Sequence, residues 1–467
     1  MKIKHQELFI PTGDPFHGCV LDRKKYAAVL SEVLKTYSDG FVLALNSQWG
    51  TGKTTFVRMW QQYLKNEGFA TLYFNSWEND FDTNPLTALL AELKNILPSD
   101  KQIAFNKLLK KSGVLAQNVL PALAKAVAKK YIDIEEVSAG IEGLTKAATE
   151  LLKDEIKSYT ARQKGLVDFK EQLQQFVGEL GTKPFVFFID ELDRCKPAYA
   201  VELLEQIKHF FSVPGIVFVL SIDKVQLGHC IRGAYGSEAL NTEEYLKRFI
   251  DLEFTLPEPD EQRFCTYLFN YFSFGDFFDN NSRKNASELK LDGRNFIDFS
   301  ASLFKGHKLT LRQQEKLFAH ARVGLLTFEK TEYVFPSIYL LLLFGRTFHN
   351  QLYTKLRRAE IPLRQVLTEI REWLPSQIPD NQNTFYEVTQ SLFFLFYLNH
   401  YRNIKPDDKA LENYKVESLA SWPIFPTLER DEKVLQRIGS VFDKGYRRLS
   451  LTVFFDHIEL INELKPA

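Results

Sequence analysis

The chain has 467 residues, enough for roughly two or three domains and for a large buried core. Apolar residues make up 45% and charged residues 25%, which excludes a chain dominated by disorder. The 59 basic residues balance the 59 acidic ones, so no global field would draw the protein to nucleic acid or to a membrane surface.

The cysteines and the apolar stretches limit the cellular compartments in which we expect the protein. Four widely spaced cysteines without a C-x-x-C pair indicate neither a disulfide framework nor a zinc site, and fit a reducing cytosol. Residues 1–7 lack the apolar core of a signal peptide. The longest apolar stretches, Tyr339 to Phe344 and Leu392 to Leu398, are far shorter than the roughly 20 residues that span a bilayer. We therefore expect a cytoplasmic protein without a transmembrane helix, and the 40 phenylalanines indicate thick aromatic cores.

The first predicted elements are a helix and a buried strand. Apolar residues recur at helical spacing from about Asp22 to Tyr37, and Ser38, Asp39 and Gly40 end that helix. The apolar run from Phe41 to Leu45 that follows predicts a buried strand.

A glycine-rich segment connects this strand to an amphipathic helix over Phe56 to Lys65. Glycines allow a tight turn that aims N–H groups at phosphate oxygens, beside the positive end of the new helix. The segment therefore predicts a phosphate-binding loop, in which Lys53 contacts the β- and γ-phosphates and Thr54 holds Mg²⁺. Ser47 stands where the pattern G-x-x-x-x-G-K-[ST] has its first glycine. The predicted nucleotide-binding residues are Trp49, Gly50, Thr51, Gly52, Lys53, Thr54 and Thr55.

The segment before the first strand is a second candidate for nucleotide contact. In many nucleotide-binding folds this segment closes over the base, which makes Asp22 and Arg23 candidate nucleotide-binding residues. A helix that only packs against the core is an equal alternative.

The next region predicts one strand and then a long helical insertion. Ala70 to Phe74 is an apolar run typical of a second buried strand. Asn84 and Pro85 supply an N-cap and a first-turn proline for the helix that follows. From about residue 86 to residue 181 the pattern is almost all helical. Its most apolar part, Val114 to Ala128, favours an amphipathic helix that stays in water, with a membrane-surface role as the alternative.

An apolar strand over Phe185 to Ile189 ends in an acidic pair, Asp190 and Glu191. A buried parallel strand delivers such carboxylates to the carboxyl edge of the sheet, where ligands of these folds bind. We expect Asp190 to bind Mg²⁺ through water and Glu191 to orient or deprotonate the attacking water beside the γ-phosphate. The alternative is an ordinary acidic turn at a strand end.

The following segments predict a helix over Val201 to Phe211 and a buried strand over Gly215 to Ile222. At the end of that strand, Ser221 and Asp223 are placed to sense the γ-phosphate. Alternatively, and with equal support, Asp223 is the N-cap of the next helix.

One more strand is predicted at the end of the strand-rich part of the chain. Arg248 precedes a strand that ends at Pro257. Arg248 could stabilise transition-state charge on a nucleotide in its own or a neighbouring subunit, or form a surface ion pair.

Beyond Pro257 the pattern is helical and rich in phenylalanine, so we predict a domain boundary there. Thr310 is the predicted N-cap of a helix whose first turn carries Arg312. Arg312 could reach back to the phosphates, although a helix-surface arginine is the alternative. Further helices are predicted at about Ile338 to Arg357, Leu363 to Trp373, Thr384 to Tyr401 and Lys433 to Ser440.

Several motifs together resemble the KAP family of P-loop NTPases, over roughly residues 18 to 320. They are W-G-x-G-K-T at Trp49 to Thr54, F-N-x-W at Phe74 to Trp77, F-I-D-E-L-D-R-C at Phe188 to Cys195, Y-L-x-R at Tyr245 to Arg248 and L-x-L-R at Leu309 to Arg312. Two letters depart from the family pattern: Ser47 replaces the usual glycine, and Glu191 replaces the aspartate often found there.

The resemblance implies an α/β P-loop NTPase of the additional-strand type, with a parallel five-stranded core sheet and a helical lid. The predicted elements divide the chain into a core at 1–85 and 182–258, a helical insertion at 86–181 and a helical region at 259–467, which the resemblance identifies as a lid and a C-terminal helical domain. The resemblance also bears on function. It further implies ATP and Mg²⁺ as cofactors and an ATPase that acts as a switch or motor in bacterial anti-phage defence. The expected partners are a protein effector and, with nucleotide, further copies of the chain.

Two other functions remain open on the sequence. One is a scaffold that binds nucleotide with little turnover, for which Ser47 is the support. The other is a nucleic-acid-remodelling ATPase, based on basic clusters at Lys355 to Arg358 and Tyr446 to Arg448, against which the neutral total charge argues.

Overall fold

The computed structural model describes residues 9–81, 84–96, 101–103, 105–110, 145–181, 183–287, 289–374, 383–415, 422–423, 438 and 449–463. The chain divides into two compact units, over Leu8–Pro257 and Glu258–Ala467. The segments Val114 to Ala128 and Tyr446 to Arg448, and all of the predicted helix at Lys433 to Ser440 except residue 438, lie outside the described residues.

The first unit contains a sheet of five parallel strands in the order β2-β3-β4-β1-β5. Strand β4 pairs with both β1 and β3, so the strand after the acidic pair separates the phosphate-loop strand from the acidic strand. The predicted additional-strand arrangement is therefore confirmed. The strands are β1 (Asp39–Asn46), β2 (Thr71–Asn75), β3 (Phe185–Asp190), β4 (Ile216–Ile222) and β5 (Leu252–Thr255).

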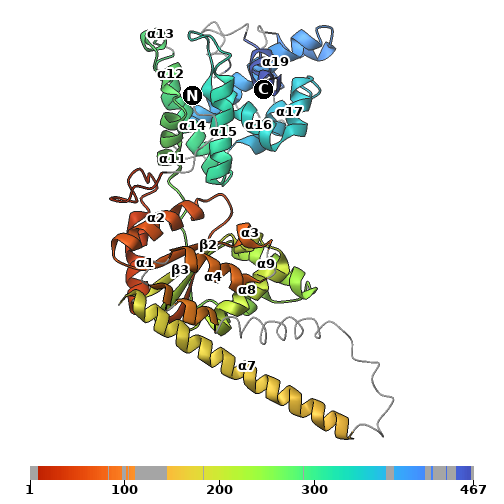
Figure 1. Ribbon diagram of the computed structural model, residues 1–467. Helices are drawn as coiled ribbons and strands as arrows, with labels where there is room; N and C mark the ends of the chain where they lie inside the picture. Colours follow the sequence, from red (N-terminus) through yellow and green to blue (C-terminus); the bar gives the residue numbers. More distant parts are fainter. Residues whose placement is uncertain are drawn as a thin grey trace. The chain divides into compact units, whose positions relative to one another are not determined.

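Helices cover both faces of this sheet (Figure 1). Successive side chains of a strand point to opposite faces, and the two apolar cores follow that alternation. Phe187 and Phe218 face one core, whereas Val186 and Val219 face the other. Helices α4 (Pro85–Ile96), α7 (Thr145–Leu180), α8 (Pro197–Phe210) and α9 (Lys224–Tyr235) complete the first core, and α1 (Lys24–Thr36) and α2 (Lys53–Asn66) complete the second. Burial on both faces explains why these strands are continuous apolar runs.

The helices whose bounds the structure describes in the first unit include α1 (Lys24–Thr36), α2 (Lys53–Asn66), α3 (Ser76–Asn79), α4 (Pro85–Ile96), α7 (Thr145–Leu180), the 3₁₀ turn η2 (Leu192–Arg194), α8 (Pro197–Phe210), α9 (Lys224–Tyr235) and α10 (Thr242–Leu246).

Two predicted helix starts move by a few residues for reasons of backbone geometry. Helix α1 begins at Lys24 rather than at Asp22, because Asp22 has a positive φ of 50° that no helical residue adopts. Helix α2 begins at Lys53, directly after Gly52 in the left-handed region. The predicted cap at Asn84 is confirmed, since its Oδ1 accepts the N–H of Leu86 at 3.1 Å.

The regular elements of the second unit are all helices among its described residues. Its helices are α11 (Glu261–Tyr271), α12 (Gly275–Phe278), α13 (Asn281–Asn285), α14 (Asp292–Gly306), α15 (Leu311–Gly324), α16 (Pro336–Phe348), α17 (Asn350–Arg357), α18 (Val366–Glu369), η3 (Ile370–Trp373), α19 (Asn383–Ile404), η5 (Lys409–Tyr414) and α21 (Leu451–Glu463). Among the described helices of the chain, none is long and apolar enough to cross a bilayer.

Phenylalanine fills the cores of both units, as its frequency predicts. Rings of Phe187 and Phe218 stack on neighbouring strands with centroids 4.9 Å apart. In the helical unit, Phe274 and Phe296 lie 4.8 Å apart at the centre of a larger aromatic cluster. These are ordinary packing geometries for aromatic pairs.

Candidate active site

Four neighbouring strands place one row of residues near the carboxyl edge of the sheet. Asn75 of β2 pairs with Asp190 of β3, Asp190 pairs with Ser221 of β4, and Ser221 pairs with Leu45 of β1. By the two-residue alternation, Asp190 and Ser221 point to the same face as Val186 and Val219, which is the face covered by α2. The acidic strand end and the start of the phosphate-loop helix therefore share one face of the sheet.

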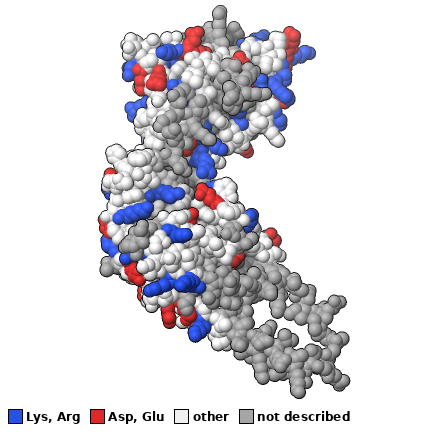
Figure 2. Space-filling view, viewed as in Figure 1, with Lys and Arg blue, Asp and Glu red and all other residues white. Residues whose placement is uncertain are grey.

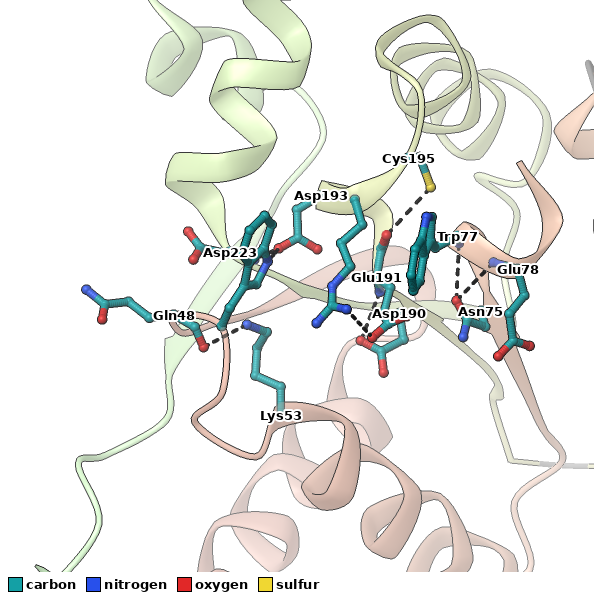
Figure 3. Close-up of polar contacts among 12 residues, drawn as sticks. Gln48, Lys53, Asn75, Trp77, Glu78, Asp190, Glu191, Asp193, Cys195 and Asp223 are labelled. Atoms are coloured by element: carbon teal, nitrogen blue, oxygen red, sulfur yellow. Dashed lines mark hydrogen bonds and ion pairs between the residues drawn. The ribbon is translucent and has the colours of Figure 1, made fainter. Parts of the chain in front are cut away.

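The phosphate loop has the backbone its glycines predict. Gly50 and Gly52 have φ of 81° and 82°, a conformation that favours glycine. Lys53, the first residue of α2, is 8% exposed, and its Nζ donates to the carbonyl oxygens of Ser47 and of Gln48, the latter at 3.1 Å (Figure 3). Burial lowers the pKa of Lys53, while Asp193, Asp223 and Asp190 act in the opposite direction.

Ser47 does not need the conformational freedom of glycine, because its φ is not positive. Its N–H donates to the carbonyl of Ile222 at 3.1 Å, and its hydroxyl donates to Oγ1 of Thr51 at 2.8 Å. Thr51 in turn donates to the carbonyl of Gln48 at 2.8 Å. The departure from the loop pattern thus adds a hydroxyl bond across the loop.

Arg23 supports the loop through its backbone. Its Nη1 donates to the carbonyl of Gly52 at 3.0 Å and its Nη2 to the carbonyl of Thr51 at 2.8 Å. The side chain is buried, which lowers the pKa of Arg23. Asp22 instead forms an exposed ion pair with Lys25 at 2.8 Å. Contact of Arg23 or Asp22 with a base remains a prediction.

Thr54 and Thr55 are exposed in the first turn of α2, directly after Lys53. In that position the hydroxyl of Thr54 remains a predicted Mg²⁺ ligand.

The acidic pair is held by its surroundings (Figure 3). Asp190 is 1% exposed and accepts the hydroxyl of Tyr73 at 2.9 Å and the N–H of Glu191 at 2.9 Å. Glu191 has a positive φ of 59° and pairs with Arg194 at 3.4 Å. Burial raises the pKa of Glu191, opposed by the charge of Arg194 and by a hydrogen bond from the Asn75 side chain. A raised pKa suits a carboxylate that must accept a proton.

Asp193 has a structural role that its position in the sequence motif did not reveal. One carboxylate oxygen accepts both the indole N–H of Trp49 at 2.6 Å and the backbone N–H of Asp223 at 2.9 Å. Burial raises the pKa of Asp193, and the Trp49 bond opposes this. Asp193 therefore ties the phosphate loop to the ends of β3 and β4. The only feature of the sequence that points to this role of Asp193 is its position three residues after Asp190.

Asp223 caps helix α9, since its Oδ1 accepts the N–H groups of Val225 at 3.2 Å and Gln226 at 3.3 Å. This was one of the two alternatives for Asp223, and a role toward the γ-phosphate remains a prediction. Ser221 is 1% exposed, and its hydroxyl has no hydrogen-bond partner among the described residues.

Arg248 lies away from this edge of the sheet. The next strand pairs Leu252 with Leu43, and Asp251 exchanges hydrogen bonds with Val42, in the first half of β1. The carbonyl of Arg248 accepts a bond from Lys208, near the end of α8. Arg248 is thus exposed at the amino edge, opposite the phosphate loop.

Arg312 belongs to the second unit, where it is exposed in the first turn of α15. The predicted cap of that helix is confirmed, because Thr310 and Gln313 form a reciprocal capping box. A contact of Arg312 with phosphates remains a prediction.

The basic cluster on α17 is partly neutralised. Arg357 pairs with Glu459 at 3.4 Å and Arg358 with Glu360 at 3.8 Å. Basic and acidic side chains both occur over each unit on the face that Figure 2 shows. These contacts give no support to a nucleic-acid site on α17.

The site fits a magnesium nucleotide by the chemistry of its groups. The loop glycines hold the conformation that turns N–H groups toward an anion. The ammonium group of Lys53 places a positive charge in the loop. Ser221 contributes a buried hydroxyl that lacks a hydrogen-bond partner among the described residues. Mg²⁺ in such sites takes few protein ligands and keeps several waters, which Thr54 and Asp190 can accommodate.

A phosphate loop after β1, an acidic pair after β3 and an intervening β4 define an α/β P-loop NTPase of the additional-strand type. The family model described as "KAP family P-loop domain" matches residues 23–320. The chain belongs to the KAP family of P-loop NTPases.

Two protein relatives are recognisable by sequence. The chain is 22% identical over 233 residues to the phage T7 exclusion protein of Escherichia coli K12, a match that covers 47% of this chain and 30% of that protein. It is 32% identical over 173 residues to an uncharacterised protein of Methanocaldococcus jannaschii, covering 32% of this chain and 88% of that one. The chain thus spans less than a third of the exclusion protein.

Among solved structures, the ORC2 protein of Aeropyrum pernix in ADPNP–ADP complexes aligns over 95% of this chain and 94% of its own. The identity is 12% and the TM-score 0.29. Likeness at that level carries no functional argument.

Proposed function

We propose that the chain binds ATP with Mg²⁺ and hydrolyses it to ADP and phosphate. The observation that carries the proposal is the meeting of Lys53 and Asp190 on one face of the sheet at its carboxyl edge, with Glu191 directly after Asp190. A lysine beside a cradle of N–H groups, a carboxylate for the metal and a second carboxylate for water are the parts that phosphoryl transfer to water requires.

Each residue has a defined task in this reaction. Lys53 and the loop N–H groups bind the phosphates, while Thr54 and Asp190 would hold Mg²⁺. When bound, the metal neutralises charge on the phosphates. Glu191 accepts a proton from the water whose oxygen bonds the γ-phosphorus, and the bond to the bridging oxygen of ADP breaks. The hydroxyl of Ser221 can donate to a phosphate oxygen.

The biological setting we propose is anti-phage defence in bacteria, with the ATPase acting as a switch or motor beside a protein effector. Support comes from the family and from the printed name of one relative, the phage T7 exclusion protein. A cytoplasmic location would suit a protein that works with ATP and an effector.

Phosphate release by wild type and by Glu191→Gln tests the proposed chemistry. Loss of the general base should lower turnover roughly 100-fold or more while nucleotide still binds. Glu205→Gln is a matched control, because Glu205 is also half-buried but lies on α8 and bonds Tyr235. Equal rates for wild type and Glu191→Gln would rule out this mechanism.

Protection of cells against phage infection tests the proposed setting. Lys53→Ala should abolish nucleotide binding and, with it, protection measured as plaque numbers. Protection that survives Lys53→Ala would favour a scaffold that needs no nucleotide. A salt-sensitive shift of labelled DNA or RNA by the purified protein would instead favour nucleic-acid remodelling.

A further inference from the structure

Arg194 lies between two tryptophans beside the acidic pair. Its guanidinium carbon is 5.5 Å from the ring centroid of Trp49 and 5.6 Å from that of Trp77. Residues Trp49 and Trp77 are 41% and 52% exposed, whereas the other three tryptophans of the chain are fully buried. A guanidinium near two aromatic rings is held by cation–π attraction and by contact with the rings.

The same guanidinium contacts the predicted general base. Nη1 of Arg194 lies 3.4 Å from Oε1 of Glu191. Glu191 has a φ of 59°, which is uncommon for a residue with a side chain and persists only where neighbours hold it. Arg194 is thus placed to fix the direction in which the Glu191 carboxylate points.

The pair differs from an ordinary surface ion pair at the same spacing. Arg263 and Asp260 are also three residues apart, at 3.5 Å, but their side chains are 63% and 54% exposed. Those of Arg194 and Glu191 are only 24% and 17% exposed. Exposed pairs contribute little, whereas a partly buried arginine held by two rings has a defined position.

We propose that Arg194 is a positioning residue for hydrolysis: held between Trp49 and Trp77, it orients the carboxylate of Glu191 beside the phosphate loop. Trp49 belongs to that loop and Trp77 follows β2, so the stack links the elements on both sides of the acidic strand. The inference rests on the proposed ATPase function, in which Glu191 is the base.

Turnover of Arg194→Ala gives the first readout. We expect kcat to fall about 10- to 100-fold with little change in KM, because a misoriented base slows chemistry without weakening phosphate binding. In a Glu191→Gln background the same change should add almost nothing, since Arg194 acts through Glu191. Arg194→Lys keeps the charge but not the planar group, and should restore kcat only in part.

Tryptophan fluorescence of the nucleotide-free protein gives a second readout that does not depend on activity. Acrylamide reaches only the exposed rings, so it reports on Trp49 and Trp77. Arg194→Ala should increase quenching, because the guanidinium no longer covers the two rings. Arg263→Ala, which removes the exposed pair of matching spacing, should change neither quenching nor turnover.

The outcomes distinguish a failure of the proposed ATPase function from a failure of the role proposed for Arg194. Wild type without turnover would overturn the ATPase function and this assignment with it. Wild-type turnover that Arg194→Ala leaves unchanged, or a full additional loss in the Glu191→Gln background, would overturn the role of Arg194 alone. Unchanged acrylamide quenching in Arg194→Ala would show that the guanidinium does not cover the rings of Trp49 and Trp77.

Discussion

At the scale of single residues, Arg23 determines which way the phosphate loop presents its backbone. It donates to the carbonyl oxygens of Thr51 and Gly52. In a planar trans peptide the C=O and the following N–H point in opposite directions. Carbonyls held by Arg23 therefore turn the N–H groups of Gly52 and Lys53 away from Arg23, so its contacts fix the donor side of the loop.

Arg23→Ala should weaken nucleotide binding roughly 10- to 100-fold, because two hydrogen bonds from a charged donor to the loop are lost. Arg23→Lys should recover little, since a single ammonium lacks the fork that spans two carbonyls. Nucleotide titration followed by tryptophan fluorescence measures the affinity. Lys25→Ala is the control, because Lys25 is exposed and its ammonium pairs with Asp22 rather than with the loop. An affinity equal to that of wild type would show that the loop holds its shape without Arg23.

Sequence reasoning identified candidate site residues where they are close in the chain, and missed the contacts between residues that are distant in the chain. The phosphate-loop residues and the acidic pair follow strand ends, so their local pattern fixes their surroundings. The bond from Trp49 to Asp193 joins residues 144 positions apart, and the bonds from Arg23 cross 28 and 29 positions. No local pattern carries that information. The burial of the Ser221 hydroxyl likewise depends on three strands packing together.

At the scale of elements, the sheet followed from its apolar runs, whereas two predicted helices were wrong. Leu363 to Trp373 was expected as one helix, but the structure has only the short α18 followed by the 3₁₀ helix η3 there. Ile338 to Arg357 was expected as a single helix, but α16 ends at Phe348 and α17 begins at Asn350. His349 between them has φ −132° and ψ 47°, outside the helical region. No proline or glycine marks this break. The ring centroid of His349 lies 5.4 Å from that of Phe344 and 6.2 Å from that of Trp373. The break between the two helices therefore coincides with tertiary packing.

Two helical glycines should respond to alanine in opposite directions. A Cβ at Gly178 of α7 would meet nothing within 4 Å, so Gly178→Ala should stabilise the protein by about 1 kcal/mol through helix propensity. A Cβ at Gly345 of α16 would meet Trp373 ring atoms within 2.6 Å, so Gly345→Ala should destabilise by about 1–3 kcal/mol. Urea unfolding of both variants measures the sign. Stabilisation by Gly345→Ala would mean that Trp373 can move aside.

At the scale of the whole molecule, the fold separates Arg248 from its own phosphate loop. Residue 251 is level with Val42, and the loop follows Asn46. Four residues of strand correspond to about 13 Å, and Arg248 lies further toward the amino edge. We propose that Arg248 acts on the nucleotide of a neighbouring copy, and that 259–467 forms the lid and C-terminal domain of a protein whose core is 1–85 and 182–258.

Mixing two inactive variants tests the action of Arg248 on a neighbour. Arg248→Ala should lose turnover by about 1,000-fold, as expected for an arginine that stabilises transition-state charge. Mixed with Glu191→Gln, it should regain part of the activity, because one copy supplies Arg248 to the other copy's intact Glu191. Glu191→Gln mixed with Lys53→Ala should regain none if the subunit that binds nucleotide must also supply the base. Mass measurements with and without ATP should show the assembly. Wild-type turnover in Arg248→Ala would show that Arg248 serves only as a surface residue, whereas lost turnover without recovery on mixing would overturn its action on a neighbouring copy.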